Sequence, residues 1–188
     1  MLVFLDFEAS SLSKQSYPIE VAWVFEDGRS EEYLIRPAPA WTDWDPAAEA
    51  IHHIRRATLL AEGTAHELVA RRMVDSLTGH DLLASAPSWD GKWLSALLRA
   101  AGFPRHSLRL RDSDDAHREC AEAILSATVP SERLAETVAG LLARTDPRGT
   151  DRRPIHRALA DAQAEYARWL QVRSTAQAMA RDNSAPSR

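Results

Sequence analysis

The chain has 188 residues, of which 45% are hydrophobic and 27% are charged, and its formal net charge is −4. This length supports one domain with a substantial core and excludes two ordinary ones. The negative charge argues against a protein that grips duplex nucleic acid over its whole surface, since such proteins are usually basic. It leaves room for a protein whose clustered carboxylates hold cations.

The first third of the sequence predicts an antiparallel meander. Leu2–Glu8 and Pro18–Glu26 are apolar runs with strand periodicity. Asp27-Gly28 is typical of a hairpin turn, and Glu31–Arg36 would form the third strand. The segment 37–48, which contains proline and tryptophan, is expected to be a loop.

The rest of the sequence alternates predicted helices with two short strands. The expected helices are 64–78, 90–101, 114–126, 131–144 and 154–178, and the expected strands are 81–86 and 108–111. Three antiparallel strands followed by strand, helix, strand and terminal helices indicate an α/β domain with a mixed five-stranded sheet. We expect this single domain to cover residues 1–178, followed by a disordered tail at 179–188.

The number of cysteines and the length of the apolar runs bear on disulfides, membrane segments and the cellular compartment. The single cysteine, Cys120, excludes an intrachain disulfide and a cysteine metal cluster. The apolar run Met1–Leu5 is too short for a signal peptide or a membrane span. No later window reaches the roughly 18 apolar residues of a spanning helix. We therefore expect a cytoplasmic protein with no membrane segment.

Two acids stand at the end of the first predicted strand. Asp6 and Glu8 are two residues apart, so strand alternation points both side chains to the face that also carries Leu2 and Phe4. That face changes from apolar to acidic at the carboxyl end of the strand, where ligands bind in open α/β sheets. Two neighbouring carboxylates repel unless a cation lies between them. For such a pair by itself, a solvent-facing strand end is the alternative.

Three further polar residues fit the same edge of a sheet. Asp90 follows a predicted strand at the head of a predicted helix, where a carboxylate either serves a site or caps the helix. His156 and Asp161 are five residues apart, a rotation of roughly 140° on a helix, so they do not share one narrow face. We expect His156 in the loop or first turn and Asp161 one turn deeper. A surface histidine is the alternative.

The order of these residues resembles the DEDDh family of 3′-5′ exonucleases. Three stretches carry the catalytic pattern: LDFEASSL at 5–12, PSWDGKWL at 87–94 and HRALADA at 156–162. PIEVAWV at 18–24 is similar to the second strand of the family, and AIHHI at 50–54 to its histidine-containing loop. The resemblance covers nearly the whole chain, and the order of elements matches the ribonuclease-H-like fold of the family.

The resemblance implies a hydrolase that removes nucleoside 5′-monophosphates from the 3′ end of single-stranded RNA or DNA. Asp6, Glu8, Asp90 and Asp161 would hold two Mg²⁺ or Mn²⁺ ions, which prefer oxygen ligands. His156 would be the general base, because an unperturbed imidazole with a pKa of about 6.5 suits that role near neutral pH. Homodimers occur in the family, so a homodimer is a further expectation.

The resemblance also implies residues that hold the terminal nucleotide. They are small, apolar or aromatic residues of the matching motifs: Ala9, Ser10, Leu12, His52 and Trp89. Leu12 would be a wedge between the last bases or ordinary core. Trp89 would stack on a base or pack beneath its helix. His52 would contact the terminal phosphate.

The sequence departs from the family pattern in two places, which bear on substrate choice rather than catalysis. Ala9–Ser11 stand where Thr-Gly is usual, and Ser85-Ala86 where His-Asn is usual. A non-catalytic nucleic-acid-binding module of the same fold and a phosphodiesterase for small nucleotides remain alternatives. Four arginines near the last motif either contact the substrate backbone or form a solvated loop: Arg148, Arg152, Arg153 and Arg157.

Overall fold

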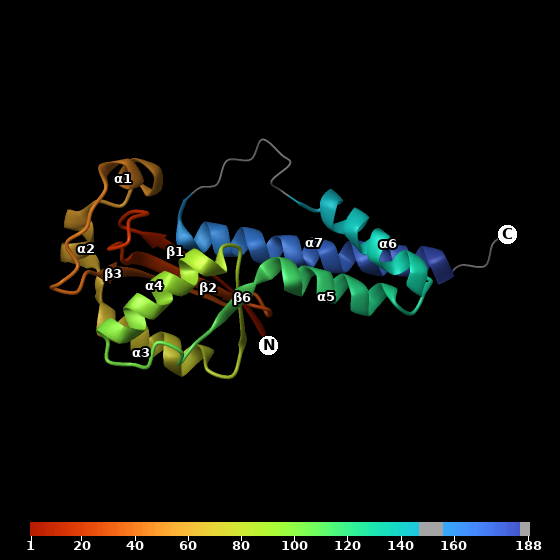
Figure 1. Ribbon diagram of the computed structural model, residues 1–188, viewed down its shortest axis with the longest axis horizontal. Coiled ribbons are helices and arrows are strands. Elements are labelled where there is room, and N and C mark those ends of the chain that lie inside the picture. Colours follow the sequence, from red (N-terminus) through yellow and green to blue (C-terminus); the bar gives the residue numbers. More distant parts are fainter. Residues whose placement is uncertain (147–155, 185–188) are drawn as a thin grey trace.

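The computed structural model of the protein describes residues 1–146 and 156–184 (Figure 1). Six strands lie within these ranges: β1 Leu2–Ala9, β2 Pro18–Phe25, β3 Ser30–Arg36, β4 Thr64–Ala65, β5 Asp81–Ala84 and β6 Leu110–Asp112. Seven helices lie within them: α1 Pro46–His52, α2 Arg56–Glu62, α3 His66–Leu77, α4 Pro87–Ala100, α5 Ser113–Leu125, α6 Ser131–Arg144 and α7 Ala158–Ser184.

The strands form one mixed sheet in the order β4-β3-β2-β1-β5-β6. β1, β2 and β3 are antiparallel neighbours, whereas β5 and β6 continue from β1 as parallel strands. This confirms the predicted α/β class and the meander followed by parallel strands. The sheet has one strand more than the five predicted, because the two residues of β4 pair with the end of β3, and two residues are too few to show a strand period.

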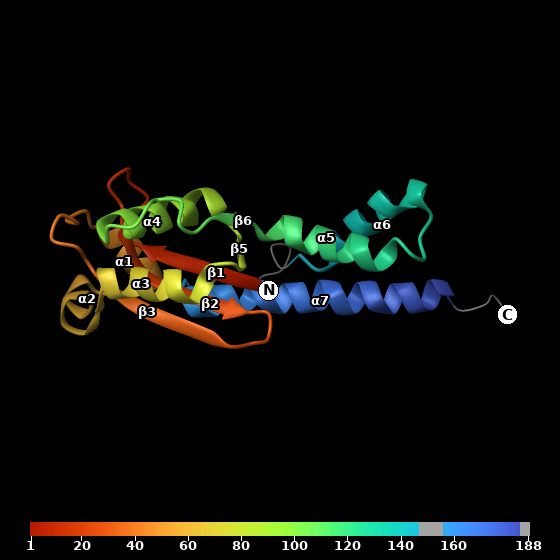
Figure 2. The ribbon, with the colours of Figure 1, turned by 90° about the horizontal axis from the view of Figure 1, so that it is seen from below.

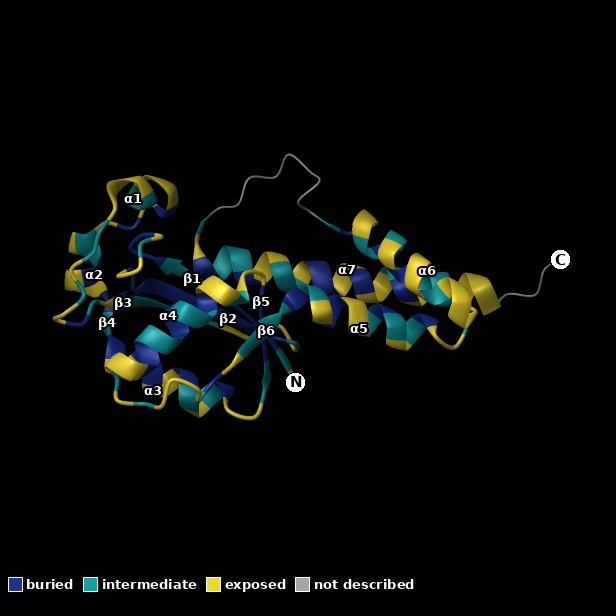
Figure 3. Cartoon of the chain, viewed as in Figure 1, coloured by how far each residue is buried: buried dark blue, intermediate teal, exposed yellow. Residues whose placement is uncertain are grey.

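Alternation along β1 and β2 separates two layers of packing. On one face of the sheet, Val3, Leu5 and Phe7 join the core cluster formed with α3 and α4. On the other face, Phe4 packs against Trp169 of α7. Figure 3 shows the buried residues concentrated along the sheet and the inner sides of these helices. The face that carries Asp6 and Glu8 is therefore the face covered by α7.

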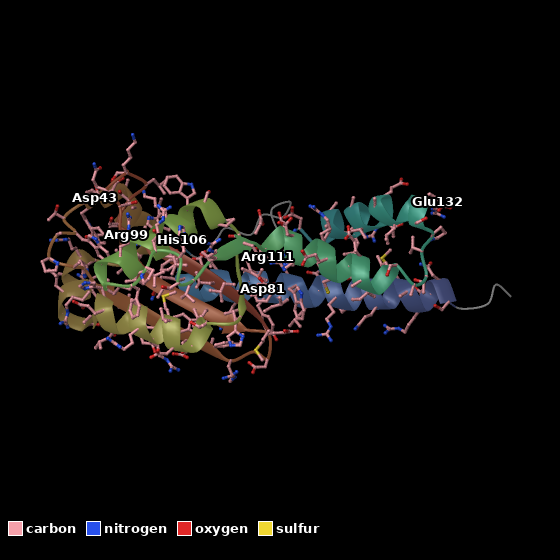
Figure 4. All side chains as sticks on the ribbon, turned by 60° about the horizontal axis from the view of Figure 1, so that its bottom comes forward. Asp43, Asp81, Arg99, His106, Arg111 and Glu132 are labelled. Atoms are coloured by element: carbon pink, nitrogen blue, oxygen red, sulfur yellow. The ribbon has the colours of Figure 1, made fainter. Side chains whose placement is uncertain are left out.

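Helix α7 extends beyond the sheet and forms a second layer with α5 and α6 (Figure 2). A separate apolar cluster holds the three helices together, with Leu125 of α5, Leu141 of α6 and Val172 of α7 fully buried. Arg111 on β6 ties this part to the sheet, because its guanidinium pairs with Asp81 on β5 and Glu119 on α5 (Figure 4). No helix of the described residues has the length and apolarity to cross a membrane.

The boundaries of the last helix differ from the prediction. α7 begins at Ala158, and the predicted start at Pro154 lies outside the described residues. At the other end the helix continues to Ser184, so residues 179–184 of the predicted disordered tail are helical. Met179 and Ala180 pack against the α5–α6 cluster, and this packing gives the end of the helix the tertiary support that its sequence alone does not reveal.

Two short helices, α1 and α2, occupy the region after β3. The predicted loop 37–48 ends at Pro46, where α1 begins with Asp45 as its N-cap and a hydrogen bond from the backbone N–H of Ala47. Each of the two helices has seven residues, about two turns, which is too short for a hydrophobic period to be recognised. His52, expected in a loop, is the last residue of α1.

Candidate active site

Asp6 and Glu8 lie at the carboxyl end of β1 on the face covered by α7. The surrounding alternation is the one that the sequence predicts, since Phe4 lies on the same face and Phe7 is buried in the core on the opposite face. Both acids are half-buried. They therefore sit where α7 and the strand edge meet, not on a solvent-facing strand end.

Asp90 reaches the same strand from α4. Its side chain is only 2% exposed, and its Oδ1 accepts a hydrogen bond from the backbone N–H of Phe7 at 3.3 Å, between the two acids of β1. The helix begins three residues earlier, at Pro87, and its N-cap position is Ala86. Asp90 is thus not the N-cap of α4, because Ala86 holds that position, and its carboxylate reaches the backbone of β1.

His156 and Asp161 approach from the start of α7. His156 precedes the helix and has a left-handed backbone conformation, with φ of 53°, whereas Asp161 lies in the first turn. Glu8, His156 and Asp161 offer ligand atoms that all lie within 4.8 Å of one another. The structure thus brings together residues from both ends of the described chain, with His156 in the loop as the spacing predicts.

Burial and mutual repulsion raise the pKa values of the clustered acids. The pKa of Asp6 lies well above its ordinary value, first because of burial and then because of the charges of Asp90, Glu8 and Asp161. The pKa of Glu8 is raised to about 8 by burial, Asp161 and Glu20. Burial raises the pKa of Asp90 to about 7 against the hydrogen bond from Phe7. Such a site favours protons or cations.

The raised pKa values predict how the stability of the metal-free protein responds to pH. Glu8 and Asp90 keep protons up to pH values of about 8 and about 7, whereas in the unfolded chain such acids lose them near about pH 4. The folded protein therefore binds more protons in this window, and its free energy of unfolding should fall as the pH rises from about 4 to about 8. The measurement is the melting temperature in EDTA across this range.

Removing one charge or adding a cation should reverse the loss. We expect Asp6→Asn to raise the melting temperature of the metal-free protein at pH 8, and Mg²⁺ to raise that of the wild type. Asp75→Asn, at an exposed acid of α3, is the control and should change little. A lower melting temperature for Asp6→Asn in EDTA would contradict the clustered arrangement.

Leu12 and Trp89 are the exposed residues among those predicted to hold the substrate. Leu12 is 70% exposed, so it is not an ordinary core residue, and Trp89 is 39% exposed. Trp89 stacks on Trp93, and the ammonium group of Lys92 lies 5.1 Å from the centre of the Trp89 ring. Part of the Trp89 ring thus remains open to solvent directly before Asp90.

The other predicted substrate residues are turned inward. Ala9 belongs to the core, and the hydroxyl of Ser10 accepts a hydrogen bond from the Tyr17 N–H. A substrate contact from this stretch would therefore come from its backbone. His52 is buried: its Nδ1 accepts a hydrogen bond from the Ile54 N–H, and its Nε2 has no partner among the described residues. Both ring nitrogens of His52 thus lie away from solvent, and its phosphate contact stays a prediction.

Asp43 fixes the loop that carries Leu12, a role that the sequence pattern does not reveal. Its carboxylate accepts hydrogen bonds from the hydroxyls of Ser10, Ser11 and Ser13, and Figure 4 shows it at the end of the molecule opposite Glu132. The loop is thus held by its own serines. The sequence shows the run of serines, but it does not show their partner, because Asp43 lies 30 to 33 residues away.

Arg157 also has a partner that sequence reasoning missed. It pairs with the buried Glu20 of β2 at 2.6 Å, although its own side chain remains 46% exposed. The other arginines of that group, Arg148, Arg152 and Arg153, lie outside the described residues. The sequence feature that could have indicated Glu20 is its place as a single acid within an otherwise apolar strand.

Comparison with known proteins gives relatives by structure alone. No protein-family model matches the sequence, and no curated protein matches it. The zinc-bound complex of Escherichia coli exonuclease I with single-stranded DNA superposes with a TM-score of 0.64 at 20% identity, over 96% of this chain and 42% of that one. The exonuclease I of Methylocaldum szegediense gives 0.63 at 18% identity, over 93% and 41%.

The chain has a ribonuclease-H-like fold. It spans less than half the length of the exonuclease I chains that it matches. Within this fold, the carboxyl end of β1 carries Asp6 and Glu8, and α7 closes over them with Asp161. At this level of identity the likeness establishes the fold, and the activity has to be argued from the site.

Proposed function

We propose that the protein is a divalent-metal-dependent 3′-to-5′ exonuclease acting on single-stranded nucleic acid. The observation that carries the proposal is the convergence of Glu8, His156 and Asp161 within 4.8 Å beside two further acids, Asp6 and Asp90, whose pKa values are raised. Structures of exonuclease I with single-stranded DNA support the substrate class. A cytoplasmic location and a homodimer remain predictions.

The donor set fits hard divalent cations. Asp6, Glu8, Asp90 and Asp161 supply carboxylate oxygens, the ligands that Mg²⁺ and Mn²⁺ prefer. Cations would offset the burial and the mutual repulsion that raise the pKa values of Asp6 and Glu8. Two bound ions would stabilise the charge on the attacking and leaving oxygens of a phosphodiester. The four acids would therefore be the metal ligands.

His156 would move the proton. Its ring lies beside Glu8 and Asp161, in the loop before α7. As general base it would accept the proton of the attacking water. The phosphodiester bond at the 3′ end then breaks, the water oxygen stays on the released nucleoside 5′-monophosphate, and the remaining chain keeps a 3′-hydroxyl.

The test is direct. Purified protein is incubated with end-labelled single-stranded RNA or DNA, with Mg²⁺, with Mn²⁺ and with EDTA. Stepwise shortening from the 3′ end that requires the metal supports the proposal and identifies the preferred sugar. Metal binding without turnover would favour a binding module instead. Cleavage of a dinucleotide but not of longer strands would favour a phosphodiesterase for small nucleotides.

Trp89 provides a prediction about substrate grip. If its exposed ring stacks on a base, Trp89→Ala should raise KM for an oligonucleotide by about tenfold and change kcat less, since stacking contributes about 1–3 kcal/mol per base. Leu12→Ala should act in the same direction. Leu68→Ala, at another exposed apolar residue on α3, is the control. Unchanged KM in both site variants would assign the two side chains no contact with the substrate.

A further inference from the structure

Glu20 is a carboxylate in an unusual place. It lies in the middle of the sheet on β2, a strand that is buried along its whole length, and it is only 2% exposed. In the antiparallel ladder it stands directly opposite Glu8 of β1, so the two side chains share one face of the sheet. Two acids at opposed positions repel each other, and Glu20 contributes to the raised pKa of Glu8. A buried acid in this position needs a strong partner.

That partner is the segment just before α7. Both carboxylate oxygens of Glu20 accept hydrogen bonds from Arg157 Nε at 3.1 Å, and Oε1 accepts a further one from Nη2 at 2.6 Å. Oε2 also accepts from the backbone N–H of Ala158 at 2.9 Å. Ala158 is the first residue of α7. A side chain from the sheet thus holds an N–H that the helix itself leaves unpaired.

This contact sits between the two active-site residues of the segment. His156 precedes Arg157 and has the left-handed φ of 53°, which is uncommon for a residue other than glycine and needs support from its surroundings. Asp161 follows, and its N–H donates to the carbonyl oxygen of Arg157 at 3.0 Å. The position of Arg157 and Ala158 therefore determines how His156 and Asp161 approach Glu8.

We propose that Glu20 is a positioning residue, which holds Arg157 and the first N–H of α7 so that His156 and Asp161 meet Glu8. The charge of Glu20 is balanced by Arg157, so its carboxylate stays paired with Arg157 and Ala158, and the carboxylate of Glu8 stays available for a cation. The kinetic part of this inference rests on the proposed exonuclease function. The structural part does not, because it concerns only where the start of α7 lies.

The chain offers a matched control for a merely stabilising ion pair. Arg72 on α3 donates from Nε and Nη2 to the two carboxylate oxygens of Glu31 on β3, at 2.8 and 2.7 Å. This pair likewise joins a helix to a strand, but it involves no residue of the active site. The Glu31→Ala variant measures the effect of losing a bidentate ion pair. The Glu20→Ala variant adds to this any effect of displacing the start of α7.

The first measurement is amide hydrogen exchange of the metal-free proteins. Glu20→Ala should speed exchange at the start of α7, residues 158–161, by about tenfold, as expected for the loss of a helix cap. Residues 170–176 of the same helix should be unaffected. Glu20→Gln, which keeps the size and the acceptor oxygen, should give a smaller change and guards against a variant that does not fold. Glu31→Ala should leave both segments unchanged.

The second measurement is steady-state cleavage of a single-stranded oligonucleotide. Loss of residues that orient metal ligands typically costs about 10- to 100-fold, so Glu20→Ala and Arg157→Ala should each lower kcat by about that factor with little change in KM. Glu20→Gln should recover part of the loss, and Glu31→Ala should retain wild-type kcat.

The two measurements separate the possible failures. Wild-type exchange at 158–161 in both Glu20 variants would overturn the positioning role, whatever the activity. Faster exchange in a protein whose wild type cleaves no nucleic acid would keep the positioning role and refute the proposed function. Equal losses in Glu20→Ala and Glu31→Ala would reduce Glu20 to an ordinary stabilising ion pair.

Discussion

Asp6→Asn is expected to lower the single-turnover rate of cleavage by about three orders of magnitude or more, because it removes a charged metal ligand from the centre of the acid cluster. Asp161→Asn should have a similar effect from the α7 side. After burial, the charges of Asp90, Glu8 and Asp161 all raise the pKa of Asp6. Asp6 therefore lies close to each of the three other proposed metal ligands. The measurement is cleavage of a labelled single strand in saturating Mg²⁺ or Mn²⁺.

Two controls make this result specific. Asp75→Asn, at an exposed acid of α3, should keep the wild-type rate. A titration with Mn²⁺ should show weaker ion binding in Asp6→Asn, while the melting temperature in EDTA stays at or above that of the wild type. Near-normal turnover of Asp6→Asn would mean that the assignment of the site is wrong.

His156→Ala should lower kcat by about 10²- to 10⁴-fold, the usual contribution of a general base, and leave KM and ion binding nearly unchanged. That pattern marks an interaction made in the transition state. Because the ring of His156 lies as close to Glu8 and Asp161 as an additional ligand would, the ion titration is the informative part. Loss of ion binding would make His156 a ligand and not the base, and a wild-type rate would remove it from the mechanism.

The backbone at His156 calls for a matched variant. Alanine is strained at a positive φ, whereas asparagine tolerates it, so His156→Asn should reproduce the loss without the strain. His53 has nearly the same conformation, with φ of 58°, and is exposed at the end of α1. His53→Ala therefore reports the effect of the backbone change alone and should keep full activity.

Local periodicity accounts for the part of the site that was predictable. A period of two residues puts Asp6 and Glu8 on one face of β1 and Phe7 on the other, and the structure has them there. The carboxyl ends of parallel β1 and β5 lie at one edge of the sheet, which is why Asp90, just after β5, reaches the backbone of Phe7. These relations depend on neighbours in sequence and on strand direction.

Partners far apart in sequence account for the part that was not predictable. Glu20 and Arg157 are 137 residues apart, and no local pattern joins them. Asp43 serves three serines across a loop, and the end of α7 is supported by packing of Met179 and Ala180. Short helices such as α1 lack the length for a period. In each case the tertiary contact, not the local preference, decides the outcome.

The division of the site between β1 and α7 has a consequence for the order in which the protein matures. The strands come from the first part of the chain and emerge from the ribosome early, whereas His156 and Asp161 belong to its last described helix. Contacts of such large sequence separation form late in folding. A nascent or partly folded chain thus presents no more than three of the four acids, without the histidine. If the proposed site binds ions, tight ion binding becomes a mark of completed folding, and the proposed nuclease activity should appear only after α7 has docked.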